Sequence, residues 1–355
     1  SVTVNAGKSV SVPFASTEKG EWIRVKTDKN TLATVSFNYT TADPRSTSSD
    51  PICQGLTTVK QNTTIGGLLY GLGDNRRALG VLANVTVDGK TSETGYYEMG
   101  DKLELVRKED TKTTDFIRSK FGIPQQVVSI EEGSVLIVDD LNRRWRLPLG
   151  DETYKELTNQ GVLRVCREVA TERDMFSCMG TFYELPAENA DGYAKIRPIS
   201  THNYRINDYA SYRGMLVLTG VTPEEGKENP HIIVSDDGKA AVWVGVIDDL
   251  WTLGKPVGHG GPWKNTDVKV GIASDPYLIG FYDKKELSLS HQSDKKVVIT
   301  VEVDPTGNGD WMEYASYAVQ PGERFVQQLP EAFQARWIRF VSDTDTKATA
   351  WLDYK

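Results

Sequence analysis

The chain has 355 residues, of which 25% are charged and 39% are hydrophobic, a composition typical of a soluble globular protein. The formal net charge of −8 is spread along the sequence, and the short basic cluster at Arg143, Arg144 and Arg146 has acidic residues nearby, so we expect no nucleic-acid partner. No run approaches the roughly 18 apolar residues that a spanning helix needs, and Ser1 starts no basic-then-apolar leader, so we expect no membrane partner either.

Strand patterns begin at the N-terminus. Segments 1–14, 22–28 and 33–40 alternate polar residues with apolar or β-branched ones, the period-two pattern of half-buried antiparallel strands. Segment 134–149, "SVLIVDDLNRRWRLPL", predicts a hairpin whose turn falls near Asp140 to Asn142.

Two short segments predict helices instead. Segment 113–122 begins at a Thr cap and ends at Gly122, and segment 150–161 begins near Asp151 and ends at Gly161. Neither alternates with strands as a parallel α/β sheet requires, which disfavours a doubly wound fold or a TIM barrel.

The C-terminal half again predicts strands. In segment 231–246, "HIIVSDDGKAAVWVGV", the Asp237–Gly238 pair suits a hairpin turn. Further strands are predicted at 180–186, 194–200, 214–221, 285–291, 296–303, 311–319, 335–343 and 346–354.

These patterns predict an all-β fold. Residues 1–285 are expected to form a β-propeller, for which about seven blades of roughly 40–50 residues would fit the whole length, although no exact repeat is present. Residues 286–355 carry evenly spaced strands with Asn-Gly and Pro-Gly turns, and we expect a β-sandwich-like module there, or terminal blades of the propeller.

The three cysteines show no metal-binding spacing. Cys53, Cys166 and Cys178 lack a CxxC pair and have no histidine close by, so we expect no zinc site. Cys166 and Cys178 flank a short segment that two neighbouring strands could occupy. The sequence leaves open a disulfide between them or three buried free thiols.

Segment 197–291 resembles the secreted β-propeller proteins that degrade plant and microbial polysaccharides. The likeness lies in "INDYASYRGMLVLTG", "SDDGKAAVWVGVIDDLW", "LGKP" and "SDPYLIGFYDKKELSLSH". Within that group the segment is similar to the propeller lyases that release rhamnose from glucuronate. The resemblance covers at most a third of the chain and transfers no catalytic residue. It implies a secreted or periplasmic protein that acts on an oligo- or polysaccharide.

The densest polar cluster is "STHNYRINDYASYRG". His202 and Tyr204 could exchange a proton with a uronic acid, and Arg205 or Arg213 could hold its carboxylate. Asp208 belongs to the same predicted catalytic group. The alternative is that these side chains only bond to one another within the fold.

A second set of residues is predicted to line the substrate. His259 lies among glycines in "GKPVGHGGPWK", and the aromatic and charged side chains near it could contact a sugar ring. This predicted binding set consists of Tyr212, Trp251, His259, Trp263 and Lys264.

Paired aspartates recur at predicted turns. Adjacent strand residues point to opposite faces, so Asp248 and Asp249 cannot both flank one glycosidic bond if a strand runs through them. Asp139–Asp140 and Asp236–Asp237 stand at hairpin turns, where Asp favours the turn itself. We therefore favour a structural role for these pairs.

No cofactor is predicted. The stretch "DPTGNGDW" from Asp304 has the oxygen-rich start of a calcium loop but lacks the distal Glu, so a surface turn is favoured and a structural calcium is the alternative. The sequence favours an exo-acting polysaccharide lyase or glycoside hydrolase on an acidic or deoxy-sugar glycan. The alternatives are a glycan-binding module without catalysis and a structural propeller.

Overall fold

The computed structural model describes residues 51–355 apart from 74–76, 124–127, 171, 172, 331, 332 and 334, together with scattered positions between residues 2 and 35. The predicted strands at 1–14 and 22–28 are wrong where the structure describes them, since residues 2–8, 10, 12, 14 and 24–28 form no strand. The predicted strand at 33–40 lies outside the described residues except at 33 and 35. The chain divides into one compact unit at 44–261 and a second that combines 1–43 with 262–355. This division lies earlier in the sequence than the expected boundary at residue 285.

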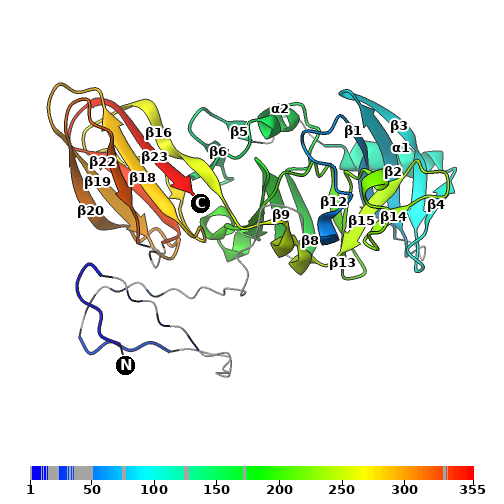
Figure 1. Cartoon of the computed structure of the whole chain (residues 1–355), viewed down its shortest axis with the longest axis horizontal. Coiled ribbons are helices and arrows are strands. Elements are labelled where there is room, and N and C mark those ends of the chain that lie inside the picture. The colour runs from blue at the N-terminus through cyan, green and yellow to red at the C-terminus, as the bar shows by residue number, and fades with distance from the viewer. Residues whose placement is uncertain are drawn as a thin grey trace. The chain divides into compact units, whose positions relative to one another are not determined.

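The unit at 44–261 is built from small antiparallel sheets whose strands follow one another in the sequence (Figure 1). We name three of them sheets A, B and C. Sheet A contains β1 Thr63–Gly71, β2 Leu79–Val87, β3 Lys90–Met99 and β4 Leu105–Lys108. Sheet B contains β8 Cys166–Ala170, β9 Arg173–Cys178, β10 Thr181–Pro186 and β11 Arg197–Thr201. Sheet C contains β12 Tyr209–Tyr212, β13 Met215–Leu218, β14 Ile232–Val234 and β15 Ala241–Gly245.

Three further strands and two helices lie between these sheets in the sequence. Strands β5 Ser129–Ile130, β6 Val135–Val138 and β7 Arg144–Leu147 pair in that order. The α1 helix, Thr111–Phe121, begins at Asp110, whose carboxylate accepts the N–H of Thr113, and the α2 helix spans Thr153–Asn159. Both predicted helices and both predicted hairpins are confirmed.

Sheet C lies between the other two sheets. One of its faces packs against sheet B in a core that includes Phe182, Ile199 and Tyr209, and the other packs against sheet A through Leu69, Val81 and others. Because both faces of sheet C are covered, its inner strand β15 is apolar and buried on both sides. The first strands of the three sheets come together, since β12 lies against both β1 and β8.

The segment before sheet A closes against the loops of sheet C. Leu56 pairs with Val221, and the backbones of Gly55 and Gly226 touch so closely that a Cβ on Gly226 would lie 2.9 Å from the Cα of Gly55. A contact this short forces the backbone to move, because real Cβ atoms do not approach that near.

We expect Gly226→Ala to lower the free energy of unfolding by about 1–3 kcal/mol, the usual cost of overpacking. Gly100→Ala is the matched control, since a Cβ there meets no atom within 4 Å. Urea unfolding of both variants measures the difference. Equal stability of the Gly226→Ala and Gly100→Ala chains would show that the segment before sheet A, which contains Gly55, does not pack tightly against the loops of sheet C.

The second unit is a β-sandwich in its described part. One sheet has the order β16-β23-β18-β21 and the other contains β20, β19, β22 and β17. The bounds are β16 Gly258–Val268, which begins before the division, β17 Tyr277–Leu278, β18 Lys285–His291, β19 Val297–Asp304, β20 Met312–Val319, β21 Phe325–Gln328, β22 Trp337–Ser342 and β23 Thr346–Tyr354.

Side chains from the two sheets meet between them. Tyr317 packs on Phe325 with ring centroids 4.7 Å apart, and Nε2 of His291 hydrogen-bonds the carbonyl of Val319 at 3.0 Å. The predicted C-terminal strands are thus confirmed. The mainly β fold is confirmed as well, while the propeller and its number of blades stay predictions.

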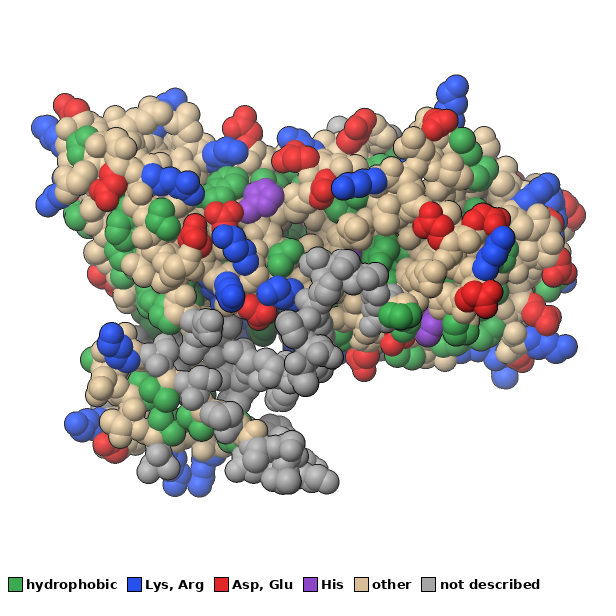
Figure 2. Space-filling model, viewed as in Figure 1, with side chains coloured by type: hydrophobic (Ala, Val, Ile, Leu, Met, Phe, Trp, Pro, Cys, Tyr) green, Lys and Arg blue, Asp and Glu red, His purple; other side chains and the backbone are tan. Residues whose placement is uncertain are grey.

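Two further expectations concern partners. Acidic and basic side chains are interspersed on the face drawn in Figure 2, and the absence of a nucleic-acid partner stays a prediction. No described helix is both long and apolar enough to cross a membrane.

Candidate functional site

The predicted cluster at 202–213 does not come together in one pocket. His202 is 6% exposed and packs against Phe182, with ring centroids 4.8 Å apart, and against Tyr204. Its Nδ1 accepts the backbone N–H of Tyr204 at 3.1 Å. Burial lowers the pKa of His202 to about 3, so the imidazole is neutral at neutral pH and is too weak a base to abstract a proton efficiently there.

Asp208 lies where the first strands of sheets A, B and C meet. Its carboxylate is 0% exposed and binds Nε of Arg164 at 2.9 Å and the guanidinium of Arg167 at 2.9 Å. It also accepts the backbone N–H groups of Leu69, in β1, and Tyr209, in β12. These bonds saturate the carboxylate, so Asp208 is placed to hold the three sheets together and not to reach a substrate.

Arg205 also lies inside the fold. It is 9% exposed, its backbone N–H donates to the carbonyl of Thr57 at 2.6 Å, and burial lowers the pKa of its guanidinium. The neighbouring Tyr204 is equally buried and pairs with Thr58. Neither side chain lines either of the two pockets described below.

The remaining members of the cluster point elsewhere. Tyr212 and Arg213 stand at the β12–β13 turn and line a pocket with residues from the β1–β2 turn. Among the described residues, no other member of the two predicted site sets lines this pocket or the pocket between the β6–β7 turn and sheet B.

The other predicted binding residues are spread through the fold. Trp251 packs at the edge of the core between sheets B and C, with the Arg197 guanidinium 6.0 Å from its ring centroid. His259 pairs through its backbone with Leu149. In the second unit, the buried Trp263 packs against Phe340, and the Lys264 ammonium lies 4.8 Å from the Trp351 ring centroid.

In the Asp248–Asp249 pair, Asp249 has a structural role. Residues Ile247–Leu253 form a short 3-10 helix and not a strand. The carboxylate of Asp249 accepts the backbone N–H of Val246 at 2.7 Å and so caps this helix, whereas Asp248 is exposed. The turn-capping role favoured from the sequence is present at Asp249.

Another pocket, which the sequence did not predict as a site, lies between the β6–β7 turn and sheet B. It measures about 320 Å³. Its acidic members come from three segments of the chain: Asp139 and Asp140 from the turn, Asp174 from β9 and Glu188 from the loop after β10. Cys166, Leu185, Pro186 and Tyr193 contribute much of the rest of its lining. We call it the acidic pocket.

Asp174 is the acidic pocket's carboxyl whose pKa is raised. Burial, together with the charge of Glu168, raises the pKa of its carboxyl, while a hydrogen bond from Sγ of Cys166 at 3.6 Å opposes the rise. A carboxyl with a raised pKa keeps its proton closer to neutral pH and can donate it to a leaving group.

The two aspartates of the β6–β7 turn differ from each other. Burial alone would raise the pKa of Asp139, but hydrogen bonds from Nε1 of Trp145 and from Arg143 outweigh it and lower the pKa. Asp139 is therefore occupied in fixing the turn. Asp140 follows it, exposed on this fixed turn and close enough to Tyr193 for its charge to help raise the pKa of that phenol, which burial raises most.

Sequence reasoning placed Asp139 and Asp140 correctly at a turn but gave no reason to single out Asp174. Asp174 stands in "REVATERDMFS" without a motif around it. Only the pairing of β8 with β9 brings it beside Cys166 and opposite the β6–β7 turn.

The cysteines and the calcium-like stretch have contacts within the fold. Cys53, Cys166 and Cys178 are free thiols. Asp304 accepts the backbone N–H groups of Gly307 at 2.8 Å and Gly309 at 2.7 Å, which fixes the turn. Among the described residues, no group of three or more His, Cys, Asp or Glu side chains is arranged to hold a metal ion.

No known protein family matches the sequence, and no curated protein matches it. Among solved structures, the weak neighbours include two glycoside hydrolases. A family 43 arabinoxylan arabinofuranohydrolase from Bacillus subtilis is 10% identical, with 82% of this chain and 79% of that chain covered and a TM-score of 0.19. A family 32 β-fructofuranosidase from Bombyx mori is 12% identical, with 79% and 78% covered and a TM-score of 0.19.

A third neighbour, PirA, is 17% identical, with 28% of this chain and 84% of that chain covered and a TM-score of 0.17. TM-scores this low do not establish a shared fold, so the site has to be judged on its own geometry.

Proposed function

We propose that the chain is a carbohydrate-active enzyme, a glycoside hydrolase, and that the acidic pocket is its active site. The observation that carries the proposal is the meeting of Asp174, whose pKa is raised, with the exposed Asp140 in one pocket. Glycoside hydrolysis requires two carboxyl groups in different protonation states on either side of the scissile bond.

Asp174 is the proposed general acid, which protonates the glycosidic oxygen as the bond breaks. Asp140 is the proposed second carboxylate, which stabilises or attacks the anomeric carbon or activates a water there. The Asp139 turn supports Asp140, because the carboxylate of Asp139 holds Arg143 and Trp145 in place. Tyr193 offers an aromatic wall for a sugar ring.

The hydrolase proposal replaces the lyase chemistry considered from the sequence. Elimination from a uronic acid needs a base that titrates near the working pH, and the low pKa of His202 does not provide one. Proximity of sheets A, B and C, with their first strands together, supports the propeller prediction, in which loops and turns at one end of the blades form the site. Secretion remains part of the proposal.

We expect Asp174→Asn and Asp140→Asn each to lower kcat by about 10²- to 10⁴-fold, the usual contribution of acid–base catalysis. The matched control is Asp191→Asn. Asp191 is exposed and close in sequence to Glu188, and its backbone is left-handed, a conformation that Asn also tolerates. Reducing ends released from a panel of arabinans, arabinogalactans, fructans and pectins measure hydrolysis, and ultraviolet absorbance of unsaturated uronates detects elimination.

Three results would contradict the proposal. Unsaturated products would indicate a lyase, binding of glycans without cleavage would indicate a binding module, and variants as active as the parent chain would place the chemistry outside the acidic pocket.

The rate of hydrolysis should fall as the pH rises and Asp174 loses its proton.

A further inference from the structure

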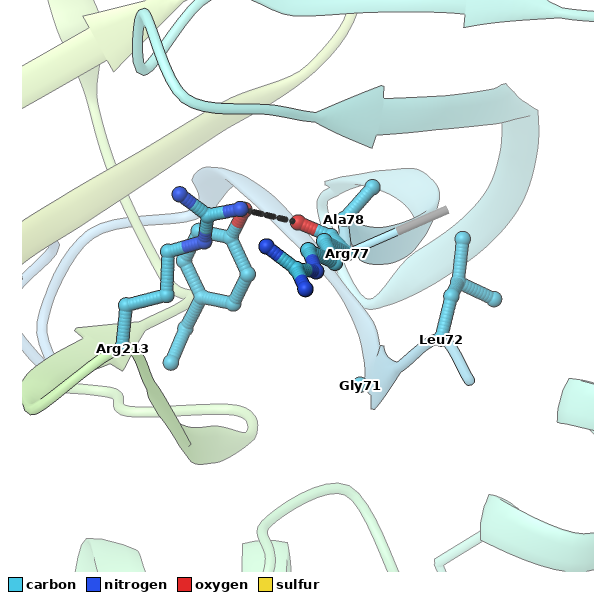
Figure 3. A pocket seen from close by; sticks show the side chains of 6 residues that line it. Gly71, Leu72, Arg77, Ala78 and Arg213 are labelled. Carbon is cyan, nitrogen blue, oxygen red and sulfur yellow. Dashed lines mark hydrogen bonds between the residues drawn. The ribbon is translucent and has the colours of Figure 1, made fainter. Parts of the chain in front are cut away.

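The pocket lined by Tyr212 and Arg213, in the same unit, carries positive charge, opposite to the acidic pocket. It measures about 540 Å³ and lies at the β1–β2 and β12–β13 turns (Figure 3). Its lining consists of Gly71, Leu72, Arg77, Ala78, Tyr212 and Arg213. No residue lines both this pocket and the acidic pocket, and the only charged side chains in its lining are the two arginines. We call it the arginine pocket.

Contacts between the two turns fix the arginine pocket. The hydroxyl of Tyr212 donates to the backbone carbonyl of Arg77 at 2.7 Å, and the guanidinium of Arg213 donates to the same carbonyl at 3.1 Å. Arg213 also lies over the Tyr212 ring, 5.4 Å from its centroid, and forms an ion pair with Asp101. Figure 3 shows the guanidinium groups of Arg77 and Arg213 near each other, with Leu72 on the other side of Arg77.

The backbone at both arginines is left-handed. Arg77 has φ 46° and Arg213 has φ 52°, a region that non-glycine residues other than Asn and Asp enter at a cost. Residues held in such a conformation cluster at ligand sites. The two turns therefore carry arginine at positions where glycine or asparagine would fit the backbone better.

Arg77 differs from Arg213 in its charge environment. In the part of the chain that the structure describes, no acidic side chain forms an ion pair with the exposed Arg77 guanidinium, whereas Arg213 is partly neutralised by Asp101. Counted over its described lining residues, the pocket thus keeps a net positive charge next to the apolar side chains of Leu72 and Ala78. A guanidinium presents paired N–H donors that match the oxygens of a carboxylate or a sulfate.

We propose that the arginine pocket is a glycan subsite that binds an oxyanion carried by a sugar, the carboxylate of a uronic acid or a sulfate ester. Its volume is within the range that holds a ligand of one or two rings. Arg77 is the principal contact for the oxyanion, Arg213 supports it, and Leu72 and Ala78 contact the apolar face of the ring. That the ligand is a saccharide rests on the proposed function.

The acidic pocket would repel an anion, so the two pockets together define a substrate class. The acidic sugar is bound at the arginine pocket and is not the residue that Asp174 and Asp140 cleave. Such a substrate is a glycan with a neutral sugar at the cleaved bond and an acidic sugar elsewhere on the chain.

Calorimetric titration of the full chain tests the subsite. The probes are a uronate oligosaccharide, the same oligosaccharide with its carboxyl groups reduced to alcohols, and a sulfated oligosaccharide. Titrations use the Asp174→Asn chain, so that no probe is cleaved and binding is measured apart from hydrolysis. We expect at least one charged probe to bind about tenfold or more tighter than the neutral one, and its affinity to fall as salt rises.

Variants locate the binding. Arg77→Gln should weaken the charged probe about tenfold and leave the neutral one unchanged, while Arg107→Gln, at an exposed arginine paired with Asp237, should change neither. Preference for the uronate or for the sulfated probe identifies which oxyanion is bound. Equal binding of the charged and neutral probes, or an Arg77→Gln chain that binds like its parent, overturns the proposal, as does inorganic sulfate competing as well as the sugar. A parent chain that hydrolyses no glycan but binds the charged probe as expected would count against the acidic pocket only.

Discussion

Asp208→Asn is expected to lower the free energy of unfolding by about 3–5 kcal/mol, the cost of removing one partner from a buried ion pair. The substitution keeps the shape of the side chain but removes the charge that faces Arg164 and Arg167, whose side chains are almost fully buried. Two guanidinium groups would then remain in the interior without a counter-charge, at the point where sheets A, B and C meet.

Denaturant unfolding measures this loss, with Asp115→Asn as the matched control. Asp115 forms an exposed ion pair with Arg118, and exposed pairs contribute about 0–1 kcal/mol. If Asp208 were catalytic, as the sequence suggested, the variant would keep its stability and lose activity. That pattern would contradict the structural role described for it.

His202 is expected to make the fold sensitive to acid. Its pKa is about 3 in the folded chain, below the ordinary value near 6.5 of an unfolded chain, so the unfolded state binds more protons between these two values. The stability that results is present above about pH 6.5 and is lost as the pH falls toward 3. From pH 7 to pH 5 this one side chain should remove about 2 kcal/mol from the free energy of unfolding.

His202→Gln tests the effect, because Gln does not titrate and retains an oxygen that can accept the N–H of Tyr204. The free energy of unfolding of the parent chain should fall more steeply between pH 7 and pH 5 than that of the variant. His231→Gln is the control, since His231 is only half-buried and hydrogen-bonds the carbonyl of Val244. Parallel pH profiles for the parent and the His202→Gln chains would show that His202 is protonated in the fold.

Local patterns were sufficient to predict most of the elements. The hairpins at 134–149 and 231–246 follow from alternation and from turn residues such as Gly238, which has φ 68°. The α1 helix was predicted from a Thr cap and a terminal glycine, and the cap was wrong, because Asp110 caps the helix and Thr113 lies inside its first turn. These signals depend on neighbours in the sequence, and tertiary packing here reinforces them.

The site depends on packing between distant segments and was not predictable in the same way. Polar residues crowd into 202–208 because three sheets meet there, and the partners of Asp208 stand at Leu69, Arg164 and Arg167. A run of polar residues on an exposed loop and a run at a buried junction look the same in one sequence. Burial, which determines whether His202 and Asp208 can reach a substrate, is set by residues that the local pattern does not contain.

The three free cysteines of the 44–261 unit can report its local unfolding. Burial raises the pKa of both Cys166 and Cys178 to about 12, so almost no thiolate forms in the folded chain at neutral pH. Alkylating reagents attack the thiolate, and an unfolded cysteine has a pKa near 8.5. The rate at which Cys178 is alkylated under native conditions therefore reports how often sheet B opens, and no cysteine has to be introduced by mutation.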